Sequence, residues 1–266
     1  MSERIRVAVL GACGRMGAEV VRTVCNASDM ELVGACDVVS IGKSVNETAG
    51  VNCPDVLIES DLASMLARTN VDVVVDFAKP FNLNNVKACV NHKASMVIGT
   101  TGENSEDLKE LQTIAESSDV AVMVIPNFAV GAVLMMTFAA QAAKYMPNVE
   151  IIELHHDKKM DAPSGTSIKT AEMVAAAREA SGVAWEEPLG ADDPARGEKH
   201  SGISVHSVRL PGLVAHQEVI FGGLGQTLTI RHDSLDRTSF MPGVLLAIRK
   251  SAEGIKGYIY GLDKIM

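Results

Sequence analysis

The sequence has no excess of basic residues. It contains 24 lysines and arginines against 33 aspartates and glutamates, and its formal net charge at pH 7 is -9. Nucleic acids and acidic membranes attract proteins that carry basic blocks, and no such block interrupts this acidic background. We therefore expect neither nucleic acid nor a membrane as a partner, and an acidic substrate would need a local basic site.

Long apolar runs, secretion signals and metal motifs are missing as well. No stretch is apolar for long enough to span a bilayer, and the start, MSERIRVAVLG, enters a strand-like segment without the layout of a signal peptide. The five cysteines include no CxxC pair, and the histidines lack the HExxH spacing of a zinc helix. These absences predict a cytoplasmic protein with reduced thiols and no bound metal.

What the chain does contain is enough apolar material for a full core. Of its 266 residues, 47% are hydrophobic and 21% are charged, which fits one large domain or two small ones. In the first half, short and nearly continuous apolar strands alternate with helical stretches, a pattern typical of a parallel sheet covered on both faces. From residue 203, strands with alternating polarity at 203–210, 215–221 and 226–232 predict an antiparallel meander.

These patterns predict an α/β protein with two domains. We expect a Rossmann-type parallel sheet in residues 1–128, which would bind a dinucleotide. Residues 129–232 would form an α+β domain for substrate binding and oligomerisation, with a mostly antiparallel sheet. The tail, residues 233–266, is predicted to be helical and to pack back on the first domain.

A glycine-rich turn, GACGRMG at residues 11–17, follows a β-rich run and precedes a helix-like stretch. Strand, glycine turn and helix are the context that a dinucleotide-binding unit requires. In such a turn Gly11 permits the tight bend, Gly14 lets a pyrophosphate approach the backbone, and Gly17 lets the helix pack on the sheet. The spacing is GxxGxxG, so Cys13 occupies the usual position of the second glycine. A tight turn that binds nothing is the alternative.

Asp37 ends the second predicted strand, residues 30–37. It follows the glycines by about twenty residues, the distance at which a dinucleotide-binding unit places the carboxylate that binds the adenosine ribose. A simple cap at the end of the strand is the other explanation for Asp37.

Three further turns, DFAKP, GTTG and PNF, follow strands that we expect to end at the same edge of the sheet. The carboxyl edge of a parallel sheet is where the nicotinamide half of a dinucleotide rests. Thr100, Thr101 and Asn127 are candidates to bond its ribose or carboxamide. Each turn taken alone is also explained as an ordinary connection between strand and helix.

The stretch ELHHDKKMDAPSGT, residues 153–166, is the predicted reaction centre. His155 and His156 fall at or just beyond the end of a short strand, and Ser164 is a good N-cap for a helix that begins near Gly165. The unpaired first amides of that helix can hold an anion, and the imidazole and lysine side chains can exchange a proton. This combination predicts a substrate that carries a carboxylate. A solvated, charged turn is the alternative.

Six motifs occur in order along the chain: GACGRMG, DF, GTTG, PNFAVG, ELHHDKKMDAPSGT and RHDSLDRTSFMPGV. With these motifs the chain resembles the bacterial dihydrodipicolinate reductases over almost its whole length. The resemblance implies an NAD(P)H-dependent oxidoreductase of lysine and diaminopimelate biosynthesis. Its reaction would be the reduction of 4-hydroxy-tetrahydrodipicolinate, a cyclic dicarboxylate, to tetrahydrodipicolinate.

The resemblance also implies roles for individual residues. His155 and Lys159 would be catalytic, with Lys159 as a proton donor, while His155 exchanges a proton, stabilises charge or orients water. The implied substrate-binding residues are His156, Ser164, Gly165 and Thr166. The implied cofactor-binding residues are Gly11, Ala12, Cys13, Gly14, Arg15, Met16, Gly17, Asp37, Phe77, Gly99, Thr100, Thr101, Ile125, Pro126, Asn127 and Phe128.

Two departures from the family pattern concern the cofactor. Many relatives carry an arginine directly after the acidic ribose residue, where it pairs with the extra phosphate of NADPH, but here Val38 follows Asp37. Because Asp37 repels that phosphate, we predict that NADH is used at least as well as NADPH, with Arg15 and Lys43 as the remaining candidates for a phosphate contact. Many relatives have threonine or serine in place of Ala78, so one cofactor hydrogen bond is expected to be missing.

The resemblance further implies a homotetramer that is joined through its antiparallel sheets. Antiparallel strands with one wet face are able to pair across subunits in this way. The sequence thus predicts small molecules and further copies of the chain as its partners.

Two other functions stay open at this point. AKP at residues 78–80 is similar to the Lys-Pro of sugar and polyol dehydrogenases, whose lysine is catalytic, so the chain could be a different two-domain nicotinamide oxidoreductase. In that case Lys79 and not Lys159 would be essential for turnover. A dinucleotide-sensing protein that does no chemistry is the other alternative, and it leaves the residues around His155 without a purpose.

Overall fold

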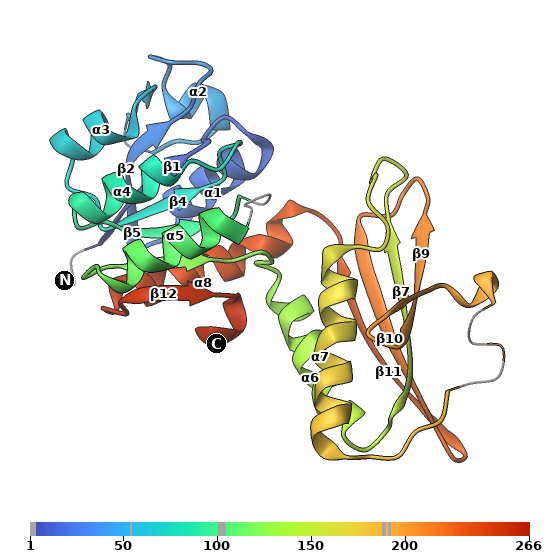
Figure 1. Ribbon diagram of the computed structural model, residues 1–266. Helices are drawn as coiled ribbons and strands as arrows, with labels where there is room; N and C mark the ends of the chain where they lie inside the picture. Colours follow the sequence, from blue (N-terminus) through green and yellow to red (C-terminus); the bar gives the residue numbers. More distant parts are fainter. Residues whose placement is uncertain (1–3, 54, 101–104, 188–189, 191–192) are drawn as a thin grey trace. The chain divides into compact units, whose positions relative to one another are not determined.

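The computed structural model describes residues 4–53, 55–100, 105–187, 190 and 193–266 (Figure 1). The chain divides into two compact units, Met1–Phe128 with Phe240–Met266, and Ala129–Ser239. We call them unit 1 and unit 2. The return to unit 1 comes at residue 240 and not at 233, because the last strand of unit 2 continues through Ser234. In the described part of the chain, no helix is long and apolar enough to cross a membrane.

The described residues of unit 1 form one sheet of seven parallel strands. Each strand lies beside the next in the order β12 (Gly257–Tyr260), β6 (Ala121–Val124), β5 (Ser95–Ile98), β4 (Val73–Asp76), β1 (Ile5–Leu10), β2 (Met30–Cys36) and β3 (Ile58–Glu59). The chain builds outward from β1 in one direction to β3 and in the other to β6, so the order reverses between β1 and β4. This is the predicted Rossmann-type sheet, and the prediction is confirmed.

Helices cover both faces of the unit 1 sheet (Figure 1). One face carries α1 (Arg15–Asn26) and α8 (Met241–Ala252), and the other carries α3 (Leu62–Arg68), α4 (Leu83–Asn91) and α5 (Ser105–Glu116). A short helix, α2 (Val45–Ala49), follows β2. Every residue of β4, β5 and β6 is buried. This explains why these strands are apolar throughout instead of alternating.

The tail of the chain contains a strand that the sequence did not predict. The helix α8 lies where a helical tail was expected, but residues 257–260 form β12, which pairs in parallel with β6. The segment GYIY is short, and its residues are only partly buried. It therefore has no periodic pattern that distinguishes it from a loop.

The described residues of unit 2 form a five-stranded sheet. Its neighbouring strands are β11 (Gln226–Ser234), β10 (Ala215–Gly223), β7 (Asn148–His155), β9 (Ile203–Arg209) and β8 (Glu198–His200). The β7–β9 pairing is parallel and the others are antiparallel, so the sheet is mostly antiparallel, as predicted. Two helices, α6 (Val130–Ala143) and α7 (Gly165–Ser181), pack on each other and against this sheet (Figure 1).

The predicted meander was wrong in its strand order. β10 and β11 form the expected hairpin, but β7 lies between β9 and β10. The turn at Pro211-Gly212 reports only local geometry, and it cannot reveal that an earlier strand is inserted next to it. As a result β7 is the central strand, and the residues at its carboxyl end have neighbouring strands on both sides.

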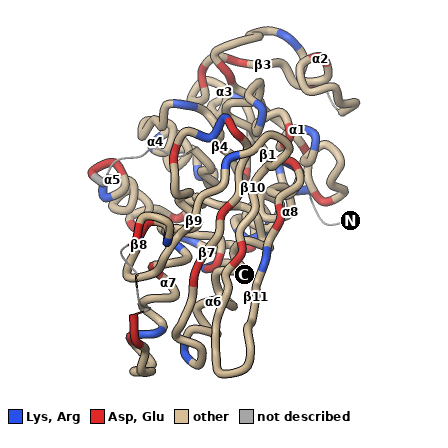
Figure 2. Tube along the Cα trace, turned by 90° about the vertical axis from the view of Figure 1, so that its right-hand side faces the viewer, with Lys and Arg blue, Asp and Glu red and all other residues tan. Residues whose placement is uncertain are grey.

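Acidic and basic residues are interspersed along the strands of this sheet (Figure 2), and several of them form ion pairs. Glu150 on β7 pairs with Arg196 and with Nε2 of His206, the latter at 2.8 Å. Successive side chains of a strand point to opposite faces. Glu150 therefore faces away from the helices, whereas Glu153 lies on the side that the helices cover, where it is completely buried.

Candidate active site

The glycine turn after β1 is closed by contacts that leave no room for a side chain. Gly11 has a φ of 78°, and a Cβ on it would lie 2.7 Å from the amide nitrogen of Ala78. A Cβ on Gly17 would lie 2.0 Å from the carbonyl oxygen of Gly11, so α1 packs directly on the turn. Gly14 is the N-cap of α1 and makes no side-chain hydrogen bond there. The first amides of α1 are thus left to solvent or to an anion.

The Asp37 carboxylate is held in place at the end of β2. Its Oδ2 accepts the amide of Cys13 at 2.8 Å, and its Oδ1 accepts the amide of Val39 at 3.1 Å. Burial and the charge of Asp37 raise the pKa of the Cys13 thiol, so Cys13 offers its amide and not a thiolate. The side chain of Val38 is 85% exposed and places no cation beside Asp37.

Two aromatic rings and a glycine meet where β4, β5 and β6 end. The ring centroids of Phe77 and Phe128 are 5.6 Å apart, and a Cβ on Gly99 would lie 2.3 Å from the Phe77 ring. The hydroxyl of Thr100 is buried and donates to the carbonyl of Ala78 at 2.7 Å, which ties two of the loops together. Only a glycine fits at position 99, because the rings occupy the space of any side chain.

The residues at this edge suit a dinucleotide. A glycine turn, a helix end without a side-chain cap and a fixed carboxylate are the parts that bind the pyrophosphate and the ribose in such units. The exposure of the other predicted residues varies: Gly14, Arg15 and Pro126 are exposed, Cys13, Met16 and Asn127 are half-buried, and Ala12 and Ile125 are buried. Thr101 lies outside the described residues.

In unit 2, the central strand β7 ends on a buried carboxylate that holds His155. The carboxylate is that of Glu153, which has no exposed surface, and its Oε2 lies 2.5 Å from Nδ1 of His155. Arg209, at the end of β9, donates to both oxygens of Glu153 at 2.8 and 2.7 Å. Burial alone would raise the pKa of Glu153, but hydrogen bonds from His155, Arg209 and Ser207 outweigh it and lower the pKa to about 2. Glu153 is therefore ionised at neutral pH.

The loop after β7 places Lys159 beside an acidic partner. Its Nζ donates to Oδ2 of Asp161 at 2.6 Å, and its amide donates to the carbonyl of His156 at 3.1 Å. The side chain of Lys159 is 20% exposed, while His156 is exposed. The two adjacent histidines thus differ in environment, since His155 is paired with Glu153 and His156 faces solvent.

The N-terminus of α7 is fixed by a buried polar network. Ser164 caps the helix, as predicted, because its Oγ accepts the amide of Ser167 at 3.2 Å. The amide of Ser164 donates to Oε1 of Glu153 at 3.2 Å. Oγ of Ser167 donates to Gln217 at 2.9 Å, and Gln217 donates to Oγ1 of Thr170 at 2.8 Å. These bonds join α7 to both β7 and β10.

Gly165 begins α7 and is open to solvent. A Cβ on it would meet no atom within 4 Å. The side chain of Ser164 is buried and its hydroxyl serves the cap, so the accessible part of this helix end is Gly165 with the half-buried Thr166. A single segment therefore combines an accessible helix N-terminus, a feature that suits an anion, with the imidazole of His155 and the ammonium group of Lys159.

Sequence reasoning missed the residues that hold this site together. Glu153 opens the predicted stretch but received no role, and Arg209, Ser167 and Gln217 were not predicted. Glu153 and Arg209 are 56 residues apart, so no local pattern connects them. The available signal was a glutamate in an apolar strand, because glutamate is almost never fully buried unless it is paired.

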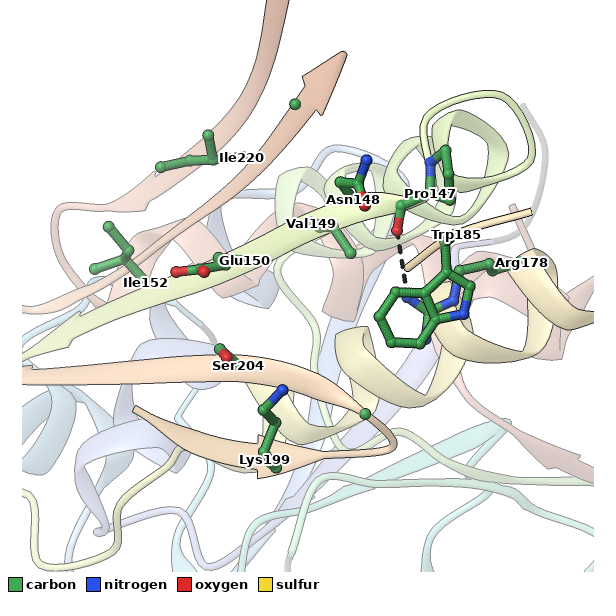
Figure 3. Close-up of a pocket in the computed structure, with 12 residues that line it drawn as sticks. Pro147, Asn148, Val149, Glu150, Ile152, Arg178, Trp185, Lys199, Ser204 and Ile220 are labelled. Carbon is green, nitrogen blue, oxygen red and sulfur yellow. Dashed lines mark hydrogen bonds between the residues drawn. The ribbon is translucent and has the colours of Figure 1, made fainter. Parts of the chain in front are cut away.

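A cavity of about 300 Å³ lies elsewhere in unit 2, near the start of β7 (Figure 3). Trp185 covers Arg178 there, with the guanidinium carbon 3.7 Å from the ring centroid, and Arg178 donates to the carbonyl of Pro147 at 3.2 Å. Glu150 also lines this cavity, whereas the predicted site residues do not. The cavity is therefore separate from the predicted reaction centre.

Within the residues that the structure describes, no cluster of three or more His, Cys, Asp or Glu side chains could hold a metal ion. The five cysteines, all of them in described segments, are free thiols.

Together, the Rossmann-type sheet, the glycine turn and the loop that carries His155 and Lys159 are typical of a two-domain, nicotinamide-dependent oxidoreductase. The family model "Dihydrodipicolinate reductase, N-terminus" matches residues 5–128, and "Dihydrodipicolinate reductase, C-terminus" matches residues 131–266. The chain belongs to the dihydrodipicolinate reductase family.

Individual relatives agree with the family models. The chain is 54% identical over 265 residues to 4-hydroxy-tetrahydrodipicolinate reductase from Listeria monocytogenes, covering 98% of this chain and 100% of the relative. The solved structure of dipicolinate-bound dihydrodipicolinate reductase from Paenisporosarcina sp. TG-14 is 44% identical, with a TM-score of 0.85, over 99% of this chain and 100% of that one. Myo-inositol 2-dehydrogenase from Lactobacillus plantarum shares only the fold, with 14% identity and a TM-score of 0.63 over 99% of this chain and 93% of that one.

Family membership confirms the function predicted from the sequence. The chain is an oxidoreductase that uses NADH or NADPH to reduce 4-hydroxy-tetrahydrodipicolinate in lysine and diaminopimelate biosynthesis. The family and the reaction do not by themselves assign a role to each residue of the site.

Proposed function

We propose that unit 1 binds the dinucleotide along the carboxyl edge of its sheet. Asp37 accepts the hydroxyls of the adenosine ribose, and the first turn of α1 after Gly14 holds the pyrophosphate. Thr100 and Asn127 follow β5 and β6 and lie on the side of the nicotinamide half. When bound, the nicotinamide supplies the hydride for the reduction.

Unit 2 binds the substrate at the N-terminus of α7. The relative from Paenisporosarcina binds dipicolinate, a dicarboxylate, and the substrate of this chain is likewise a small dicarboxylate. The start of α7 at Gly165 and Thr166 holds one of its carboxylates, because this end of the helix is the positive end of the helix dipole. Gly165 has no side chain to block the approach, and His156 contacts the substrate from the end of β7.

Lys159 donates the proton, and His155 is the second catalytic group. Hydride addition places negative charge on the conjugated ring of the substrate, and an ammonium group both stabilises this charge and protonates it. The observation that carries the proposal is the position of Lys159. Its mostly buried side chain belongs to the loop that leads from the His155–Glu153 pair to the open helix end.

NADH serves at least as well as NADPH in this proposal. The fixed carboxylate of Asp37 repels a phosphate on the neighbouring ribose oxygen, and the exposed Val38 has no positive charge to offset this repulsion. Arg15 and Lys43 are both exposed, and they are the candidates for any phosphate contact.

The chain assembles as a cytoplasmic homotetramer through the face of the unit 2 sheet that the helices leave open. Ile152 and Ile220 are half-buried on this face, between the ion pairs of Glu150 and Glu218. A surface that mixes apolar side chains with balanced charges is suited to pairing with a copy of itself. Light scattering at micromolar concentration should give the mass of a tetramer, and a monomer there would contradict the assembly.

The residue assignment is tested by replacing lysines one at a time. The substrate is generated in the assay mixture from pyruvate and aspartate semialdehyde by the synthase that catalyses the step before this reduction. The fall in NADH absorbance is then followed. We expect Lys159→Ala to lower kcat by a factor on the order of 10² to 10⁴, the contribution of a positioned general acid. The exposed neighbour Lys158 provides the matched control, and Lys158→Ala should keep nearly full activity. Loss of turnover in Lys79→Ala but not in Lys159→Ala would instead assign the chemistry to the lysine of unit 1.

A further inference from the structure

The carboxylate of Glu153 is shared by groups from three parts of unit 2. Its Oε2 accepts from Nδ1 of His155 at 2.5 Å and from Arg209 at 2.8 Å, and its Oε1 accepts from Arg209 at 2.7 Å and from the amide of Ser164 at 3.2 Å. Arg209 also donates to the carbonyl of Asp161 at 2.8 Å. The buried side chain of Glu153 therefore links the ends of β7 and β9 and the start of α7, and Arg209 extends this network to the loop of Lys159.

The hydrogen bond between Glu153 and His155 determines which ring nitrogen carries the proton. Glu153 is ionised, so both of its oxygens can only accept. The contact at 2.5 Å therefore requires a proton on Nδ1 of His155. In a neutral imidazole protonated on Nδ1, the other nitrogen, Nε2, has no proton. Nε2 is then the atom through which His155 exchanges a proton or accepts a hydrogen bond.

We propose that Glu153 is a positioning residue for the reduction, which fixes the tautomer and the direction of His155 and anchors the substrate-binding end of α7 relative to it. The inference rests on the roles proposed above for His155 and Gly165. Glu153 has no exposed surface and thus does not touch the substrate itself. It acts through the ring of His155 and through the amide of Ser164.

Arg209 makes this arrangement possible. A carboxylate that is buried without a cation would take up a proton, and it would then no longer orient the imidazole. The guanidinium meets both oxygens of Glu153 in a bidentate pair, which leaves the outer lone pairs of the carboxylate for His155 and Ser164. The hydrogen bonds that Arg209 donates to Glu153 in turn raise the pKa of Arg209, so both partners stay charged.

The chain offers a matched control for this role. Glu150 lies on the same strand and is also held by an arginine and a histidine, Arg196 and His206. It faces the opposite side of the sheet, away from His155. Removing the charge of Glu150 therefore tests what the loss of a paired glutamate on β7 does to the fold and to the proposed assembly, without a change at His155.

The first experiment needs no variant. Wild-type protein labelled with ¹⁵N-histidine is examined by NMR at neutral pH, and the resonances of His155 are assigned by their loss in His155→Asn. We expect the neutral ring of His155 to carry its proton on Nδ1. A neutral ring that is protonated on Nε2 would overturn the proposal.

The second experiment compares Glu153→Gln with Glu150→Gln. A glutamine at position 153 presents an NH₂ group to donors, so it cannot satisfy His155, Arg209 and Ser164 together. We expect kcat of Glu153→Gln to fall about 100-fold, with an altered pH profile of kcat and a changed ¹⁵N signature of His155. Glu150→Gln should keep kcat and its pH profile within about twofold. NADH binding, which belongs to unit 1, should be unchanged in both.

Further variants distinguish a protein that does not fold from a wrong role for Glu153 and from a wrong role for His155 and Lys159. If Glu153→Gln does not fold, Glu153→Asp keeps the charge but shortens its reach, and the same changes in the pH profile and the NMR signature are expected. A folded Glu153 variant with unchanged pH profile and ¹⁵N signature, whatever its kcat, would reduce Glu153 to a structural ion pair and overturn the proposal. Full activity in both His155→Ala and Lys159→Ala would instead refute the proposed function itself.

Discussion

The two units differ in the material from which their sites are built. In unit 1 the candidate cofactor site consists mainly of backbone: a glycine turn, a helix end and loops at one edge of a parallel sheet, together with the fixed carboxylate of Asp37. In unit 2 the candidate substrate site combines the helix end at Gly165 with ionisable side chains, which a buried polar network holds around Glu153. The site in unit 1 depends on positions that have no side chain. The site in unit 2 depends on charged side chains and on the groups that pair with them.

This difference predicts how each site responds to change. A backbone site tolerates few substitutions, because an added Cβ meets backbone that cannot move aside. A side-chain site tolerates added volume on its exposed surface, but it depends on the charge state of the group at its centre. The same type of mutation should therefore have opposite effects in the two units.

The largest effect is expected for Gly17→Ala. The new Cβ would lie 2.0 Å from the carbonyl oxygen of Gly11, so α1 and the turn must separate. We expect the free energy of unfolding to fall by about 3 kcal/mol, the upper end of the usual cost of overpacking, and NADH affinity to fall with it. Denaturant unfolding and NADH fluorescence measure the two quantities. Unchanged values for both would show that the turn is not the rigid part of unit 1.

The next effect concerns acid. The pKa of Glu153 is lowered from its ordinary value of 4.5 to about 2, so the stabilisation that it provides is complete above pH 4.5 and is lost as the pH falls toward 2. At about 1.4 kcal/mol per pKa unit, its full size is on the order of 3 kcal/mol. Urea unfolding between pH 6 and pH 3 should show this loss in the wild type and a flatter dependence in Glu153→Gln. Equal slopes in the two proteins would contradict the low pKa.

A smaller effect should distinguish the cofactors. Val38→Arg places a cation beside Asp37, where it can pair with the phosphate of NADPH. We expect the ratio of kcat/KM for NADPH to that for NADH to rise about tenfold, as for one added hydrogen bond to a charged group. Val39→Arg, at the next exposed position, is the control and should change the ratio less. A wild-type enzyme that already prefers NADPH strongly would contradict the role of Asp37.

The smallest effect on stability is expected for Gly165→Ala, the counterpart of Gly17→Ala in unit 2. Its Cβ meets no atom within 4 Å, so the free energy of unfolding should stay within about 1 kcal/mol of the wild type or rise slightly. The added methyl lies at the proposed carboxylate site, and KM for the substrate should therefore rise while NADH affinity is kept. A large loss of stability would show that the start of α7 is packed and not open.

The same contrast explains what the sequence could predict. Gly11, Gly14, Gly17 and Asp37 act through spacing along the chain, and spacing is visible in a sequence. The cap at Ser164 was predictable for the same reason, because N-cap preferences are local. The family resemblance added the roles proposed for Lys159 and its neighbours.

What could not be predicted depends on pairing between distant strands. The insertion of β7 between β9 and β10 brings Arg209 to Glu153 and Gln217 to the start of α7. Neither the turn at Pro211-Gly212 nor the alternation of polarity reveals that insertion. A turn reports only how two consecutive segments are joined, and alternation reports only which residues of one strand share a face. β12 was missed because a segment of four partly exposed residues is too short to show a period.

The return of the chain to unit 1 has a consequence for synthesis on the ribosome. Unit 2 is an insertion, and α8 and β12 of unit 1 emerge only after all of it has been made. Until then β6 is the last strand on its side of the sheet, and the backbone groups that pair with β12 have no strand partner. A nascent or truncated chain that ends before residue 240 would therefore present a sticky strand edge. The pairing of residues 257–260 with β6 closes this edge.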